Sequence, residues 1–269
     1  MCSFLDKEPQ TRKEKAINIA KSHGFDILPV SLNKSDRDWK ALDDETLVAP
    51  LLSIKGLGDK AIDEILKHRP FSNAEELLFT EGVSYRAFNK KAIDVLIRAG
   101  AMTDLIDDRF TGDKHFWSAV CVDKPKNKKK LNENIETYRG EKSFSEEERI
   151  AFLTELTGVF PFNLVVPPEI VQGLRRNCIP PISEFDLDLM VGWLVPREVV
   201  KRKTKTGKPY YIVVAIDSNS ETTKIRCWGV DPEKDKIHIN RPYIIRPKYN
   251  ETWGFSTRGP VGKSWKLLA

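Results

Sequence analysis

Apolar side chains recur with the 3.6-residue period of an α-helix over the first part of the chain. This period dominates from Pro50 to Gly100, where Asp59 and Asn89 stand at positions that suit helix N-caps. The pattern predicts a small all-helical domain over residues 47–106. A terminal segment over residues 1–46 precedes it, with a helix expected from Arg12 to Ser22 and a short buried strand from Ile27 to Val30.

The helical period is lost directly after this domain. Residues 107–144 are rich in Asp, Lys, Asn and Gly and have little apolar periodicity, so we predict a polar linker there. Ser145 followed by Glu148 is a capping-box signature. It predicts a helix from Glu146 to Leu156, within a helical connector over residues 145–180.

Beyond this connector the apolar period changes to 2, which is typical of β-strands. Strands are expected around Leu187 to Val195, Tyr211 to Ile216, Lys224 to Trp228 and Tyr243 to Arg246. Several short strands in succession predict a small closed or nearly closed β-barrel over residues 181–269.

The most specific local signal lies between Leu51 and Leu66, where a short helix meets Lys55-Gly56-Leu57-Gly58 and then a second amphipathic helix. Glycine lets such a turn tighten and brings backbone N–H groups within reach of a phosphate oxygen. The N-terminus of the following helix adds unpaired donors and a positive dipole end. This helix-hairpin-helix arrangement binds DNA backbone without reading bases. The alternative is an ordinary glycine-bearing turn between two helices.

A second copy of the layout follows the first. A loop from Gly82 to Ser84 leads to Asn89-Lys90-Lys91, which opens a helix with an apolar face, although this copy lacks Gly-x-Gly. Two copies in tandem favour a pseudo-symmetric unit that contacts both strands of a duplex. The expected duplex phosphate contacts are Lys55, Gly56, Leu57, Gly58, Lys60, Asn89, Lys90 and Lys91.

Basic side chains and aromatic rings gather in the barrel region. Basic side chains can follow a single-stranded backbone, and a ring that stacks on a base contributes roughly 1–3 kcal/mol. About half of the rings on alternating strands must instead face the core. The expected single-strand contacts are Lys201, Arg202, Lys203, Lys205, Lys208, Tyr210 and Trp253.

These segments together resemble a known family. Residues Ala16 to Leu105 are similar to the end of the fingers region and the tandem helix-hairpin-helix of the bacterial DNA polymerase III alpha subunit, a family C polymerase. The resemblance rests on His23 to Ser35, Ile54 to Gly58, and Asn89 to Lys91 with Ala99 to Ala101. Met190 to Trp228 is similar to the family's OB domain. The predicted fold class is therefore α+β and multidomain, an all-α tandem helix-hairpin-helix followed by a small OB-like β-barrel.

The resemblance implies the DNA-binding C-terminal portion of a replicative polymerase, with duplex primer-template and single-stranded DNA as partners. The family's palm, whose paired aspartates hold Mg²⁺, would lie before Met1. We therefore expect no catalytic residue, metal site or cofactor in this chain, and a separate polymerase chain, from a split or phage gene, that carries palm and fingers. The alternative is a stand-alone, non-catalytic DNA-binding accessory protein of replication or repair.

Two features of the sequence limit this interpretation. Asp186-Leu187-Asp188 has the form of a metal-binding pair, but no third carboxylate or phosphate-binding glycine loop stands beside it, so we reject it as a metal site. The family usually carries a short sliding-clamp-binding sequence between the hairpins and the barrel. None is found between Ile106 and Ser145, which argues against clamp binding.

Composition narrows the class of protein further. The net charge is only +5, with 44 Lys and Arg against 39 Asp and Glu, so the placement of charge matters more than its sum. The sequence has no apolar run of about 18 residues and no secretory signal, so we expect no membrane partner and a cytoplasmic location, in a bacterium or a phage-infected host.

The cysteines and one basic run complete the sequence evidence. The four cysteines are dispersed, which argues against a zinc site and a disulfide framework. Residues Lys124 to Lys130 form a basic run that is either a flexible solvated loop or a third DNA contact.

Overall fold

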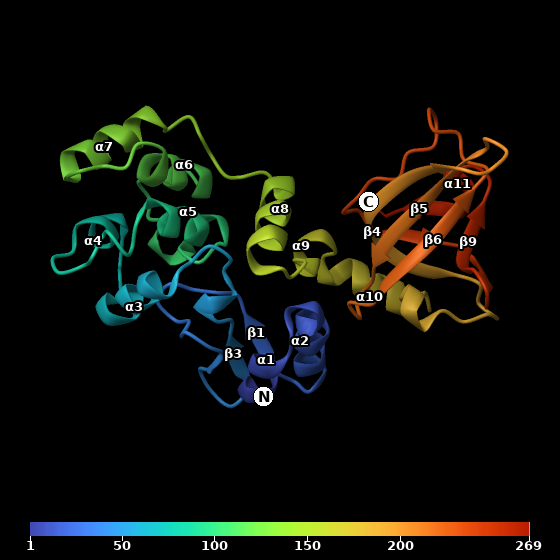
Figure 1. Cartoon of the computed structure of the whole chain (residues 1–269), viewed down its shortest axis with the longest axis horizontal. Coiled ribbons are helices and arrows are strands. Elements are labelled where there is room, and N and C mark those ends of the chain that lie inside the picture. The colour runs from blue at the N-terminus through green and yellow to red at the C-terminus, as the bar shows by residue number, and fades with distance from the viewer. Residues whose placement is uncertain (269) are drawn as a thin grey trace. The chain divides into compact units, whose positions relative to one another are not determined.

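The computed structural model describes residues 1–268, which form two compact units that adjoin in sequence between Pro161 and Phe162. The first unit is mostly helical and the second is built around a sheet (Figure 1). Within residues 1–268, no helix is long and apolar enough to cross a membrane.

The first unit contains short 3-10 helices (η), one π-helical segment (η4), α-helices and three short strands. In chain order they are α1 (Cys2–Lys7), η1 (Gln10–Arg12), α2 (Lys13–Ser22), β1 (Asp26–Leu28), β2 (Lys40–Ala41), β3 (Thr46–Val48), η2 (Leu51–Ser53), α3 (Asp59–His68), α4 (Ala74–Phe79), α5 (Lys90–Arg98), η3 (Thr103–Leu105), α6 (Asp113–Trp117), η4 (Ser118–Val122), α7 (Lys128–Thr137) and α8 (Glu146–Thr157).

The second unit begins with two helices and continues into the sheet. Its elements are α9 (Phe162–Val165), α10 (Pro168–Arg176), η5 (Ile182–Glu184), β4 (Gly192–Lys203), β5 (Pro209–Ile216), β6 (Thr222–Trp228), β7 (Tyr243–Ile245), β8 (Lys248–Asn250), β9 (Gly254–Arg258), α11 (Val261–Ser264) and β10 (Trp265–Leu267).

The tandem hairpins are held together by one apolar core. Its members come from η2, the first turn, α3, α4 and α5, because each helix places apolar residues on one side at helical spacing. Ile54, Ile62, Ile65, Leu77 and Leu96 are at most 1% exposed. This core fixes the two turns relative to each other, since interior side chains pack at nearly crystalline density.

The prediction of a polar linker over residues 107–144 is wrong for much of that segment. Helices α6 and α7, joined by the π-helical η4, lie in it, and Phe116, Val120, Leu131 and Ile135 belong to the same core as the hairpins. The apolar side chains are spread over three short elements of different period. A single repeat therefore never develops, and the periodicity test misses them.

The capping box before α8 is confirmed. The Ser145 side chain accepts from the Glu148 N–H, the Glu148 carboxylate accepts from the Ser145 N–H, and the helix ends at Gly158 in the left-handed conformation. The boundary between the two units falls inside the segment predicted as a helical connector, because α8 belongs to the first unit whereas α9 and α10 belong to the second.

The second unit is a curled seven-stranded sheet with the strand order β10-β7-β4-β5-β6-β9-β8. β4 is long enough to pair with β7 through its first residues and with β5 through the rest, and its register shifts between Pro196 and Glu198. Such a bulge bends a strand. The predicted fold class is confirmed, with the barrel present as an OB-like half-barrel.

One strand boundary differs from the prediction. Asp186 to Met190 forms an exposed turn, and β4 begins only at Gly192. Leu187 is 67% exposed, so the apparent alternation of apolar residues before Val191 does not mark a buried strand face.

Candidate nucleic-acid interface

The first hairpin turn joins η2 to α3. Gly56 has φ +88°, in the left-handed region that strains residues with a Cβ, whereas Gly58 is the N-cap of α3 with an extended φ of −83°. Between them the side chain of Leu57 is only 7% exposed and belongs to the core, and its N–H donates to the Ile54 carbonyl. The buried leucine therefore anchors a turn whose two glycines face solvent.

This turn presents backbone donors to solvent. Gly56, Gly58, Asp59 and Lys60 are exposed, and among residues 1–268 no acceptor is found for their N–H groups. Asp59 and Lys60 open α3, where intrahelical acceptors do not exist. The arrangement is suited to an anion, because neighbouring N–H groups and the positive end of a ten-residue helix act at one place.

The backbone N–H of Lys55 is not free to bind a phosphate. Its backbone N–H donates to the Leu156 carbonyl over 2.7 Å, which ties the turn to the last residues of α8. Its exposed side chain stays available. The amide role predicted for this stretch therefore belongs to the glycines and the start of α3.

The second hairpin helix supplies a cation to the same turn. A Cβ on Gly56 would lie 3.7 Å from Cε of Lys91, and Lys91 is exposed. Asn89 is the N-cap of α5 and its side chain accepts from the Ala92 N–H over 3.1 Å. The structure thus brings Gly56 and Lys91 together from the two hairpins, which their spacing in the sequence does not show. Asn89 acts as the helix cap of α5.

The second hairpin turn has no equivalent free donor at Ser84. The Ser84 N–H donates to the Glu64 carboxylate over 2.9 Å. Glu64 comes from α3, so the first hairpin supplies an anion to the second. A carboxylate at this position competes with a phosphate, and the two turns are not equivalent phosphate sites.

Acidic residues also stand beside the first turn, but they are paired. Arg37 donates to Asp59 over 2.6 Å and to Asp63 in the next turn of α3. The hydrogen bond to Asp59, and then the one to Asp63, raise the pKa of the Arg37 guanidinium. Arg37 therefore offsets the negative charge that α3 would otherwise present next to its own free amides.

The segment before the hairpins forms part of their frame. Asn33 donates to the Phe71 carbonyl over 2.8 Å and accepts from the Phe71 N–H over 2.9 Å. The backbone N–H of Leu32 donates to the Ala101 carbonyl over 2.7 Å, and the backbone N–H of Leu51 donates to the Asp36 carbonyl over 2.9 Å. The bonds of Leu32 and Asn33 attach the run from His23 to Ser35 to the hairpins, a role that sequence patterns did not indicate.

In the second unit, one face of the sheet carries a row of basic and aromatic side chains. Arg202 of β4 is directly opposite Tyr210 of β5, Tyr210 is opposite Trp228 of β6, and Trp228 is in register with Arg258 of β9. Opposite residues project from the same face. The Tyr210 and Trp228 rings stack with centroids 4.5 Å apart and planes 25° apart.

This row lies on the face turned away from the core. The neighbouring residues Tyr211, Val213 and Cys227 point into the apolar core of the half-barrel, so the alternate positions face out. Arg202 and Arg258 are exposed, and Tyr210 and Trp228 are half-buried. Trp228 and Arg258 were not among the predicted contacts, because only strand pairing places them beside Tyr210.

The remaining predicted single-strand contacts are dispersed. Lys201 and Lys203 are exposed but alternate with Arg202, so they project from the other face of β4. Lys205 and Lys208 are exposed in the turn between β4 and β5.

Trp253 stands apart from this turn, between β8 and β9, and is 64% exposed. Its carbonyl accepts from Arg226, which alternates with Cys227 and so shares the outer face with Trp228. This hydrogen bond links the Trp253 turn to the row of aromatic and basic side chains.

No cluster of His, Cys, Asp or Glu suited to a metal ion is found among residues 1–268. Asp186 and Asp188 lie in an exposed turn, where Asp186 accepts from the Asp188 N–H over 2.7 Å. The arrangement described above can bind polyanions and stack bases, and it offers backbone, lysine and arginine donors for that purpose.

Comparison with known proteins agrees with this geometry. A family described as a helix-hairpin-helix motif matches residues 24–111, which include both hairpins and the frame segment before them.

Curated relatives are DNA polymerase III proteins. The DNA polymerase III subunit alpha of Deinococcus radiodurans is 23% identical over 237 residues, 76% of this chain and 17% of that protein. The PolC-type DNA polymerase III of Staphylococcus epidermidis is 33% identical over 94 residues, 34% of this chain and 6% of that protein. The Thermus aquaticus subunit alpha is 28% identical over 109 residues, 39% of this chain and 9% of that protein.

These matches confirm the resemblance to the DNA polymerase III alpha subunit that the sequence motifs indicate. The chain spans less than a fifth of the length of these relatives, with 17% as the largest share among the three.

Proposed function

We propose that this chain is the DNA-binding portion of a replicative DNA polymerase of the DNA polymerase III type. The first hairpin turn and the start of α5 bind the backbone of duplex primer-template, and the outer face of the half-barrel binds single-stranded template. Nucleotidyl transfer then requires the parts of the polymerase that these 269 residues do not cover.

One observation carries the proposal. The exposed amides of Gly56, Gly58 and the first residues of α3 converge beside Lys91, in a segment that matches the helix-hairpin-helix family. N–H groups and an ammonium group at one place favour a phosphate, and they do so without selecting a base. Weak sequence preference is the expected consequence.

The half-barrel supplies the second part of the proposal, a surface for single-stranded DNA. Stacked Tyr210 and Trp228 offer a flat ring surface, and Arg202 and Arg258 flank it with positive charge. This combination suits unpaired bases on a charged backbone, because every base has a face that can stack.

The test is a set of equilibrium titrations of the full chain with a fluorescent primer-template duplex and with single-stranded DNA. If about six phosphates are neutralised, the logarithm of duplex affinity should fall against the logarithm of salt concentration with a slope near −5. A flat salt response would contradict the proposal.

Two variants separate the two surfaces. Replacing Gly56 and Gly58 by valine should weaken duplex binding most, whereas charge reversal at Arg202 and Arg258, which flank the stacked rings, should weaken single-strand binding most. Equal effects of both variants on both forms of DNA would contradict the assignment of duplex and single-stranded DNA to separate surfaces. Binding with strong sequence preference would exclude a backbone site.

A further inference from the structure

The basic run Lys124–Lys130 is folded against the second hairpin. Lys124 lies over the Tyr85 ring, with Nζ 5.1 Å from its centroid, and Lys128 forms an ion pair with Glu75 of α4 at 2.9 Å. Lys130 pairs with Asp123 at 2.8 Å. The run is therefore held in place by the hairpin module rather than being a free loop.

The same run adjoins the first turn of α5. Lys90 donates from Nζ to the Val122 carbonyl over 3.3 Å, at the end of η4. The next residue, Lys91, lies beside Gly56 of the first hairpin turn. The start of α5 therefore lies between the free amides of the first turn and the beginning of the basic run.

Two polar groups of the second hairpin are already occupied by hydrogen bonds within the protein. In a tandem unit each turn would be expected to hold one phosphate, but here the Ser84 N–H is bonded to the Glu64 carboxylate at 2.9 Å. The Asn89 side chain in turn caps α5 through the Ala92 N–H. These two groups are therefore already occupied within the protein, so neighbouring cations are needed if this side of the unit is to hold further phosphates.

Lys126 and Lys129 are the unengaged lysines of the run. Both are exposed, and neither has an ion-pair partner within the part of the chain that the structure describes. Lys126 precedes Asn127, the N-cap of the ten-residue α7, and Lys129 lies in the first turn of that helix, so the positive end of the helix adds to their charge.

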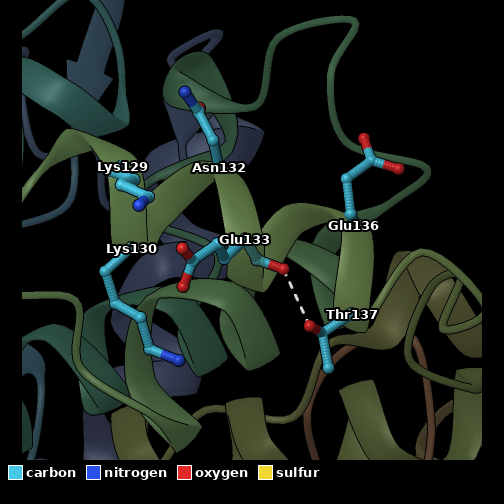
Figure 2. A pocket seen from close by; sticks show the side chains of 6 residues that line it. All are labelled: Lys129, Lys130, Asn132, Glu133, Glu136 and Thr137. Atoms are coloured by element: carbon cyan, nitrogen blue, oxygen red, sulfur yellow. Dashed lines mark hydrogen bonds between the residues drawn. The ribbon is translucent and has the colours of Figure 1, made fainter.

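Figure 2 shows how charge is distributed along α7. Lys129 and Lys130 lie at one end of a shallow surface pocket, and Glu136 and Thr137 lie at the other. The acidic side chains follow the basic ones along the helix, so the positive surface is confined to the first turn of α7 and the residues before it.

We propose that Lys126 and Lys129 add two phosphate contacts to the duplex site, beside those of the first hairpin turn and the start of α5. The ligand is the sugar-phosphate backbone of duplex DNA, which lysine ammonium groups bind as point charges. This inference rests on the proposed function of the hairpins and adds a second element to that site.

The experiment is a duplex titration of the full chain with the double substitution Lys126→Gln and Lys129→Gln at several salt concentrations. Loss of two phosphate contacts should make the salt slope shallower by about 2 and weaken duplex binding about tenfold or more near 0.1 M salt. Single-strand affinity should not change, and Lys126→Arg with Lys129→Arg should bind duplex like the unsubstituted chain.

The matched control is Lys7→Gln with Lys21→Gln, two exposed lysines of α1 and α2 in the same unit. It removes the same net charge and should leave duplex affinity within about twofold. Thermal unfolding of each variant reports folding, and because Lys126 and Lys129 are exposed we expect an unchanged midpoint.

The outcomes separate this inference from the function on which it rests. If the unsubstituted chain binds duplex but the Lys126 and Lys129 variant keeps its affinity and slope, the inference is overturned alone. An equal loss in the control would reduce the effect to net charge and would overturn it as well. If the unsubstituted chain does not bind duplex at all, the proposed function fails together with the inference.

Discussion

Lys91 of α5 lies beside Gly56 of the first hairpin turn, so that a Cβ on Gly56 would be 3.7 Å from the lysine Cε. The two residues are far apart in sequence and belong to different hairpins. Their proximity joins an ammonium group to the exposed backbone amides of a left-handed glycine. Because both groups attract anions, substitution of either residue should lower the affinity for duplex DNA.

The substitution Gly56→Ala should weaken duplex binding about tenfold. Space is available for the methyl group, since its nearest neighbours would be 3.6 and 3.7 Å away, but φ +88° costs a residue with a Cβ about 1–2 kcal/mol. Relief of that strain would turn the amide away from a phosphate, and a hydrogen bond to a charged group contributes about 1.5–3 kcal/mol. Titration with duplex DNA measures the effect.

Gly24→Ala is the matched control for this substitution. Gly24 has φ +89°, and a Cβ there would meet nothing within 4 Å. The strain is thus the same, but Gly24 lies between α2 and β1, outside the hairpins. We expect similar losses of thermal stability in both variants and a loss of duplex affinity only at Gly56. Equal losses of affinity would assign the Gly56 effect to global stability.

Removal of Arg37 should reduce duplex affinity although this residue need not touch DNA. Arg37→Gln leaves Asp59 and Asp63 unpaired beside the free amides of α3. An unneutralised charge about 4 Å from a phosphate costs about 1 kcal/mol in a high-dielectric surrounding, which corresponds to about fivefold in affinity. Fluorescence anisotropy with duplex DNA at low salt would detect this change.

A second substitution tests the electrostatic cause. Asp59→Asn in the Arg37→Gln background should recover most of the lost affinity, because it removes the carboxylate that Arg37 pairs with. If the double variant binds no better than Arg37→Gln, direct contact of Arg37 with DNA becomes the better explanation.

Trp228→Ala should weaken single-strand binding by about 1–3 kcal/mol and leave duplex binding unchanged. Trp228 stacks on Tyr210 on the outer face of the sheet. Tyr249→Ala serves as the control. Tyr249 is 48% exposed, but strand pairing through Phe255 places it on the same side of the sheet as the buried Ile225, away from the face that carries Trp228. Quenching of tryptophan fluorescence by oligonucleotides should be reduced only in the Trp228 variant.

The cysteines should differ sharply in reactivity. Burial raises the pKa of the Cys121 thiol to about 12 and that of Cys227 to about 11, whereas Cys178 is exposed. Because the thiolate is the reactive form, iodoacetamide at pH 8 should label Cys178 in the folded protein and the two buried thiols only after unfolding. Mass spectrometry of tryptic peptides would identify the labelled sites.

The same pKa shifts predict a loss of stability at high pH. Unfolded thiols lose their protons near pH 8.5, whereas the buried thiols keep theirs until the pH approaches their raised pKa values. The unfolded state therefore binds fewer protons above this pH, and the free energy of unfolding should fall as the pH rises from about 8.5 towards 11. Double substitution of Cys121 and Cys227 by alanine should remove that part of the dependence.

The sequence by itself determined the helices with one strong period and the first hairpin turn. Gly-x-Gly between two amphipathic helices, the Ser145 and Glu148 capping box and the alternating strands each depend on residues close together in the chain. Local backbone preferences and a single apolar period suffice to specify such features.

Only the tertiary structure decided which groups share a surface. It placed Lys91 at Gly56, Glu64 at the Ser84 amide, and Trp228 beside Tyr210. The polar segment after the hairpins also folds into α6 and α7, although its sequence has no sustained apolar repeat that predicts them. The physical reason is that pairing between strands and packing between helices join residues distant in sequence, and their energies depend on the whole core rather than on any local pattern.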